Sequence, residues 1–166
     1  MAGGAVNDWV LYDRVVLASV LTTLVLTIQT LAWSFFIGVP LGFALAQGPL
    51  RATRIWKLVL SWPFALPASL AALTLLPWLD RAGLSYSSTA VVIVMVLLNA
   101  PFLAVRTLVA VQQADPRLVE QAASLGAGSA ARFFHVWAPA LRPAWGVALA
   151  EVYLACLHSM SLVMIL

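Results

Sequence analysis

The sequence predicts an all-α protein that crosses a membrane several times. Apolar residues make up 63% of its 166 residues and charged residues only 9%, whereas a soluble domain carries about a quarter charged residues. Several apolar runs reach the roughly 20 residues that a helix needs to cross a bilayer. Because backbone groups in lipid must be hydrogen-bonded within their own segment, these runs are expected to be helices. Residues 1–166 are expected to form a single transmembrane domain.

Four spanning helices are delimited by the apolar runs and by the residues that interrupt them. They are expected at residues 15–47, 58–79, 88–111 and 143–166. In the second, Pro63 and Pro67 remove two backbone donors from one side, which predicts a kink. In the first, small residues recur at four-residue spacing and predict a face on which another helix packs closely. These small residues are Gly38, Gly42 and Ala46.

Basic residues predict the orientation of the chain. Seven of the nine Lys and Arg residues lie within 51–57 and 106–142, and acidic residues accompany the other two. The positive-inside rule therefore places the polar insert at about 112–142 in the cytoplasm and both chain ends outside. The stretch before Arg14 lacks the basic start of a secretory signal, so no cleaved leader is expected.

The polar insert begins with a predicted short amphipathic helix. Asp115 can cap its start and Pro116 suits the first helical position. Leu118, Ala122 and Leu125 then recur on one face. Gly126 is expected to end the helix because glycine adopts the left-handed conformation most readily.

A second short helix is expected to follow, with Ser129 as its cap. Pro139 and Pro143 are expected to separate it from the fourth span. Helices this short are marginal in water, so they must pack on the spanning helices or on a partner protein. The apolar residues available for such packing are Phe133, Phe134, Val136 and Trp137.

The insert contains a characteristic spacing of Glu120, Ala122, Gly126, Phe133, Val136 and Pro139. This spacing resembles the EAA loop of bacterial ABC importer permeases. Gln121 and Ala138 depart from the pattern. The segments "LSWPFALPASLAALTLL", "LLNAPFLAVRTLVAVQQADPRLVEQAASLGAG" and "HSMSLVMIL" also look like consecutive parts of this family, so the resemblance covers most of residues 58–166. Within the family, the arrangement is closest to permeases for thiamine and ferric iron.

This resemblance implies the transmembrane fold of a type I ABC importer. Such a chain moves a small solute, delivered by an extracytoplasmic binding protein, across the bacterial inner membrane. The loop then acts as a coupling helix that docks on a separate cytoplasmic ATP-binding subunit. The residues expected to form this coupling surface are Glu120, Gln121, Ala122, Gly126, Phe133 and Pro139.

The resemblance also implies further partners. A second permease half or subunit is expected to complete the pathway. ATP is expected on the partner ATPase, because the only lysine, Lys57, does not follow a glycine-rich turn. No directly bound cofactor, metal or nucleic acid is expected. The family has a further helix on each side of these four, so the chain is expected to be an incomplete permease or part of a fused one.

Polar residues inside the spans raise two open interpretations. Glu151 lies near the middle of the fourth span and His158 shares its face. A charged group there is costly, so it should face the bundle interior or a water-filled path. Glu151 and His158 therefore either line the route of a cationic solute or join helices by hydrogen bonding. Asn99, beside Pro101, is expected to bridge helices at a kink, with solute contact as the alternative.

Three other interpretations remain open. An amphipathic helix lying on the bilayer surface would favour Lys and Arg on its polar face, which this insert largely lacks. An intramembrane hydrolase would need residues such as Ser129 and His135, and a zinc site built on Glu151 and His158 is short of ligands. A membrane scaffold without transport activity is the third. No catalytic residue is expected, and the sequence does not name the solute.

Overall fold

The computed structural model describes residues 4–159, within which all regular secondary structure is helical. The long helices of the first part are α1 (Gly4–Ala46), α2 (Leu50–Ala65), α3 (Ala68–Arg81) and α4 (Ser88–Gln113). The second part contains α5 (Pro116–Ser124), α6 (Ser129–Arg132), the π-helical turn η1 (Phe133–Trp137) and α7 (Ala138–His158). Residues 160–166, expected in the fourth span, lie outside the described residues.

The predicted class, a polytopic helical membrane protein, is confirmed. Three helical segments are long and apolar enough to cross a membrane, and a sharply bent pair of helices makes a fourth if it counts as one span. The three are Asp13–Ala46, Ser88–Gln113 and Ser129–His158.

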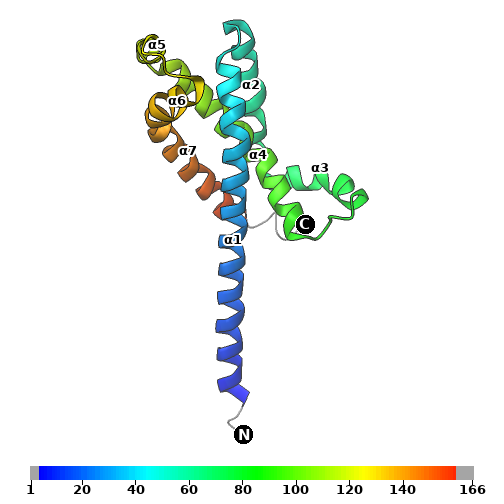
Figure 1. Ribbon diagram of the computed structural model, residues 1–166. Coiled ribbons are helices and arrows are strands. Elements are labelled where there is room, and N and C mark those ends of the chain that lie inside the picture. Colours follow the sequence, from blue (N-terminus) through cyan, green and yellow to red (C-terminus); the bar gives the residue numbers. More distant parts are fainter. Residues whose placement is uncertain (1–3, 160–166) are drawn as a thin grey trace.

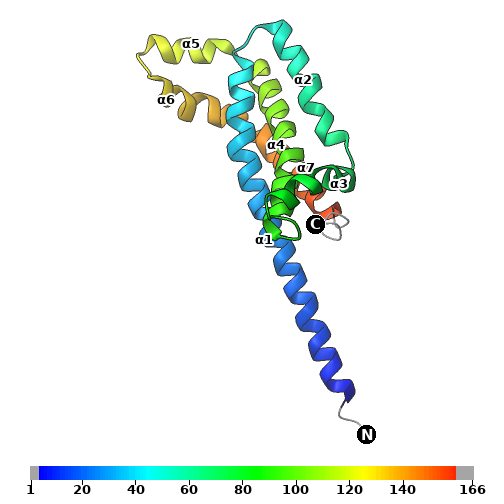
Figure 2. The same cartoon turned by 90° about the vertical axis from the view of Figure 1, so that its right-hand side faces the viewer.

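Helix α4 lies at the centre of the bundle and contacts α1, α2, α3 and α7. The 43 residues of α1 correspond to about 65 Å of helix, twice the roughly 30 Å of a hydrocarbon core. Only its C-terminal half lies beside the other helices, and its N-terminal half extends beyond them (Figures 1 and 2). At the opposite end of the molecule, α5 and α6 project sideways as an arm (Figure 2).

The small-residue face of α1 packs against α4, as predicted. A Cβ atom added to Gly38 would lie 2.6 Å from the carbonyl oxygen of Ala100. At Gly42 it would meet the backbone of Ala104 and the side chain of Thr107. Both glycines are therefore required for the close approach of the two helices. The same face continues toward the N-terminus through three small polar residues, which are buried: Thr27, Thr30 and Ser34.

The second predicted span is broken rather than kinked. Helices α2 and α3 meet at an angle of 94°, and Leu66 between them has extended backbone with φ −79° and ψ 134°. The residue before a proline is disfavoured in helical conformation, so Pro67 ends α2 at this point. Because α2 begins at Leu50, the basic segment 51–57 is helical, and the helix starts before the predicted start of the second span at residue 58.

The predicted break before the fourth span is wrong. Residues from Ser129 to His158 form one continuous helical segment, in which η1 joins α6 to α7. The backbone N–H of Ala138 donates to the carbonyl of Phe133, five residues earlier. This π-type register change lies directly before Pro139, and it accommodates the missing donor without ending the helix.

Apolar residues are buried in three clusters, all next to α4 or α7. Residues of α3 and α4 form the first: Ala71, Ala72, Leu79, Ala90, Val91, Val94, Met95 and Leu98. Val39 of α1 packs with Leu141 and Trp145 of α7 in the second. Leu103 of α4 packs with Ala148 and Val152 of α7 in the third.

Candidate functional site

The projecting arm begins with a well-defined helix start. The carboxylate of Asp115 accepts a hydrogen bond from the backbone N–H of Arg117 at 2.9 Å, and Pro116 occupies the first helical position. Both features match the sequence prediction. The cap matters because an isolated nine-residue helix is marginal by itself.

The tip of the arm is a hydrogen-bonded turn of fixed geometry. Gly126 has a φ of +81°, which a residue with a side chain adopts only at a cost. Its N–H donates to the carbonyl of Ala123, and that of Ala127 donates to Ala122, both at 3.0 Å. This pair of bonds is a Schellman motif. Ala122 and Gly126 therefore belong to one rigid element.

The return of the arm differs from the prediction by one residue. Gly128, not Ser129, is the capping residue of α6, and Ser129 is its first helical residue. The hydroxyl of Ser129 accepts a hydrogen bond from Nη2 of Arg132 at 3.4 Å. The imidazole Nδ1 of His135 lies 3.0 Å from the carbonyl of Ala131. Ser129 and His135, the residues weighed for a hydrolase, thus have separate local partners.

Aromatic contacts anchor the base of the arm on α1. Phe43 packs edge-to-face on Phe133 and on Trp137, with ring centroids 5.5 and 5.4 Å apart. About two turns further along the helix, the indole Nε1 of Trp145 donates to the hydroxyl of Thr107 at 3.2 Å, and both residues are buried. The arm is therefore joined to α1 and α4 by packing and a buried hydrogen bond.

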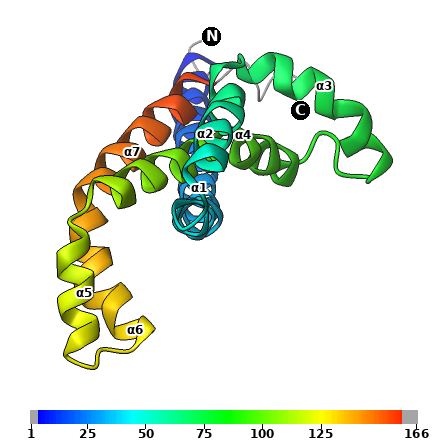
Figure 3. The same ribbon diagram turned by 90° about the horizontal axis from the view of Figure 1, so that it is seen from above.

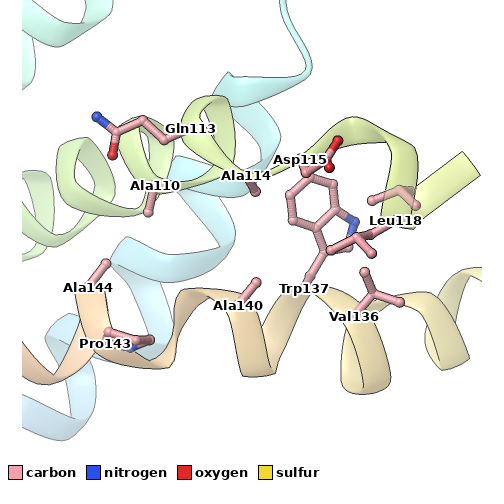
Figure 4. Close-up of a pocket in the computed structure, with 11 residues that line it drawn as sticks. Ala110, Gln113, Ala114, Asp115, Leu118, Val136, Trp137, Ala140, Pro143 and Ala144 are labelled. Carbon is pink, nitrogen blue, oxygen red and sulfur yellow. The ribbon is translucent and has the colours of Figure 1, made fainter.

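A small cavity of about 250 Å³ lies between the arm and the ends of α4 and α7. In Figure 4, the Trp137 ring lies beside the α4–α5 junction, close to Asp115 and Leu118. Most of the cavity lining is apolar or small, so α5 rests on a nonpolar base. The residues that line it include Ala110, Gln113, Ala114, Val136, Ala140, Pro143 and Ala144.

The predicted coupling residues fall into two groups. Glu120 and Gln121 are exposed on α5 and Ala122 is half-buried beside them, with Gly126 at the tip. Phe133 and Pro139 lie on the return segment: Phe133 faces α1, and Pro139 is exposed in the first turn of α7. The projecting surface is thus formed by the first four residues, while Phe133 belongs to the base.

Glu151 forms an ion pair that the sequence analysis missed. Nη2 of Arg106 on α4 lies 2.7 Å from both carboxylate oxygens of Glu151 on α7. The ring of Phe102 lies 5.1 Å from the guanidinium carbon. Arg106 and Glu151 are the only Lys, Arg, Asp or Glu residues within the four predicted spans. Because charges inside spans pair with one another, this coincidence was the signal that could have revealed the pair.

The other two polar residues of the predicted path bond within their own helices. Nδ1 of His158 lies 2.7 Å from the carbonyl of Leu154. The buried Asn99 donates from Nδ2 to the carbonyl of Met95 at 2.7 Å, so this bond does not bridge helices as predicted. Within residues 4–159, no three His, Cys, Asp or Glu side chains are grouped as metal ligands.

A larger cavity, of about 600 Å³, opens between α2, α4 and α7. Its lining contains Ser61 and Phe64 of α2 and Phe102, Arg106 and Gln113 of α4. The rings of Phe64 and Phe102 stack with centroids 4.2 Å apart. Arg106 therefore lines the cavity while its Nη2 group is hydrogen-bonded to Glu151.

No profile of a known protein family and no solved structure matches the chain. It is 33% identical over 149 residues to a probable sulfate transport system permease protein of Chlorokybus atmophyticus, covering 78% of this chain. It is 26% identical over 150 residues to a molybdate/tungstate transport system permease protein of Pyrococcus abyssi, covering 86% of this chain. The chain is similar to transport permeases.

The names of both relatives describe transport proteins and not enzymes. This agrees with the prediction of a transport subunit. The chain spans 52% and 60% of the lengths of the sulfate and the molybdate/tungstate relative, respectively. Both names specify oxyanions, so the comparison does not support the expected relation to thiamine or ferric iron permeases.

Proposed function

We propose that this chain is the membrane-spanning permease subunit of an ATP-driven importer and that α5 is its coupling helix. The observation that carries the proposal is the helical arm, which is joined to α4 by Ala114 and Asp115 and returns into α7 without a break. Its proposed contact surface consists of Glu120, Gln121, Ala122 and Gly126. Similarity to two transport permeases supports the same function.

The arm can transmit force because its return leg is one uninterrupted helix and its start is fixed by the Asp115 cap. A movement applied to α5 is passed to α7 through the continuous helix from Ser129 onward. Phe43, Phe133 and Trp137 connect that helix to α1. A flexible loop in this place would absorb the movement, whereas a packed helical hairpin moves the spanning helices as a lever.

The proposed solute is a tetrahedral oxyanion of the sulfate or molybdate type, in place of thiamine or ferric iron. The names of the relatives support this class. In addition, Arg106 already neutralises Glu151, so this carboxylate is not a free site for a cation. A role for Asn99 or His158 in solute contact remains a separate proposal.

The remaining partners follow from the proposed mechanism. A cytoplasmic subunit binds and hydrolyses ATP, and an extracytoplasmic protein delivers the solute. A second permease half completes the pathway, whether on another chain or on a longer form of this one. The proposed location is the bacterial inner membrane, with the arm in the cytoplasm.

Site-specific crosslinking tests the coupling proposal. Cys156 is the only cysteine, so a Cys156→Ala background provides a chain without thiols. We expect Ala122→Cys and Gln121→Cys to crosslink to the co-expressed ATP-binding subunit through a short bifunctional reagent, and ATP to change the yield. Ala82→Cys, an exposed position after α3, provides the control and should give no such product.

Other outcomes identify the competing functions. Recovery of the intact chain with no nucleotide-dependent partner and no uptake defect in a deletion strain would favour a scaffold. Cleavage of a peptide or ester by the purified chain alone would favour a hydrolase. Either result would contradict the coupling proposal.

A further inference from the structure

We infer that the cavity between α2, α4 and α7 is a low-affinity binding site for a tetrahedral oxyanion, with Arg106 as its ligand and Glu151 as the group that promotes release. This inference rests on the proposed function and specifies where its solute binds. Three observations carry it: the charge of the cavity lining, the unused donors of Arg106, and the ion pair to Glu151.

The charge of the lining favours an anion. Arg106 is the only charged residue among the described residues that line the cavity. Ser61 of α2 and Gln113 of α4 add polar groups, and the rest of the lining is apolar. The cavity volume of about 600 Å³ is many times the space that one water molecule requires. A small hydrated anion therefore fits beside the guanidinium.

Arg106 keeps donors free for such an anion. Both hydrogen bonds to Glu151 come from Nη2, and the other three N–H groups of a guanidinium are on Nε and Nη1. None of these three donates to another residue within 4–159. Phe64 stacks on Phe102, and the Phe102 ring lies beside the guanidinium of Arg106. This packing restricts the orientation of the guanidinium. An oxyanion can thus be bound without breaking the ion pair.

Glu151 sets the strength of binding. Its carboxylate reduces the positive charge that the anion experiences at Arg106. A site on a transport route must release its solute. An unpaired arginine would retain a divalent anion, whereas an arginine partly neutralised by a carboxylate can release it. Arg106 is therefore expected to attract the oxyanion and Glu151 to weaken that attraction.

Direct binding to variants tests the inference. The transporter is purified through a tag on this chain, reconstituted in phosphatidylcholine nanodiscs and titrated with radiolabelled sulfate and with molybdate. We expect Arg106→Gln to weaken binding about tenfold or more, because charge-assisted hydrogen bonds are lost. Glu151→Gln is expected to tighten binding about tenfold and to slow uptake.

Two further variants separate ligand binding from folding. The double variant Arg106→Gln, Glu151→Gln leaves no unpaired charge and should still bind weakly, like the Arg106 single variant. Arg81, whose guanidinium lies 5.3 Å from the Trp78 ring at the end of α3, provides a matched control. Arg81→Gln should bind sulfate as the unaltered protein does.

Several results would overturn the inference while leaving the proposed function intact. If the ATPase crosslink to α5 persists but Arg106→Gln binds sulfate normally, the cavity is not the site. If Glu151→Gln weakens binding as much as Arg106→Gln, the pair has a purely structural role. If nanodiscs containing phosphatidylglycerol abolish the sulfate binding seen in neutral lipid, the cavity is a lipid headgroup site.

Discussion

At the scale of single residues, the missing side chains of two glycines determine how closely α1 approaches α4. Gly42 lies against the backbone of Ala104, and Gly38 lies against that of Ala100. Gly146 on α7 is also helical, yet nothing lies within 4 Å of a Cβ added there. The two environments allow a steric effect to be separated from an effect of helix propensity.

Gly42→Ala is expected to destabilise the protein by about 1–3 kcal/mol, because the added methyl group forces α1 and α4 apart. Gly146→Ala is expected to be neutral or to stabilise by up to about 1 kcal/mol, since alanine is the better helix former. Reversible unfolding of both variants in mixed micelles, followed by circular dichroism, provides the measurement. Equal stabilities for the two would show that the α1–α4 contact is not tight.

Gly126 acts through its backbone conformation rather than through packing. Nothing lies within 4 Å of a Cβ added there, but its φ is +81°. Gly126→Ala is therefore expected to cost about 1–2 kcal/mol in local stability of the arm. Faster amide hydrogen exchange in α5 would report this loss. Gly128→Ala, at an equally open position with a φ of −65°, is the control and should exchange like the unaltered chain.

At the scale of elements, α4 and α7 carry the two ends of the arm. Two side-chain links join these helices, one exposed and one buried. Arg106 and Glu151 form the exposed link, and Thr107 with Trp145 form the buried one. The two links are adjacent on α4, so they fix both the spacing and the rotation of the helices. Loss of either link should loosen the connection between the arm and the bundle.

Thr107→Val tests the buried link. The substitution keeps the shape of the side chain but leaves the indole N–H of Trp145 buried without its acceptor, at an expected cost of about 1–3 kcal/mol. The double variant Thr107→Val, Trp145→Phe removes both partners and should recover much of that loss. Thermal unfolding in detergent measures both. A double variant no more stable than Thr107→Val would mean that Trp145 contributes mainly through packing.

At the scale of the whole molecule, the arm and α3 lie on opposite sides of the helix bundle and at different heights along it (Figures 2 and 3). The end of the bundle that bears the arm also holds the start of α2 with Arg54 and Lys57. The side chain of Lys57 donates to Gln112 near the end of α4 at 2.6 Å. Basic residues thus gather at the end that the positive-inside rule assigns to the cytoplasm.

A labelling experiment tests this orientation. In the Cys156→Ala background, a membrane-impermeant maleimide applied to intact cells should label Ala82→Cys. It should label Ala127→Cys, at the tip of the arm, only after the inner membrane is permeabilised. The reverse pattern would place the arm outside and would contradict the coupling proposal.

Local sequence alone determined the all-helical class, the capping of α5 by Asp115, the turn at Gly126 and the close-packed face of α1. Each depends on residues a few positions apart, or on the side-chain volume of one residue. The break at Pro67 was underestimated as a kink. The break at Pro139 was predicted but does not occur. Each proline lacks a backbone donor, but a π-helical turn accommodates Pro139, whereas the residue before Pro67 is extended and ends the helix.

Only the tertiary structure decided which residues meet across helices. Arg106 and Glu151 are 45 positions apart, and their pairing depends on the rotation of α4 relative to α7. That rotation is fixed by buried contacts such as Thr107 with Trp145, whose partners are 38 positions apart. Helical periodicity places a side chain on a face but does not say which neighbour covers it. The cavity and its arginine therefore became visible only once the helices were packed.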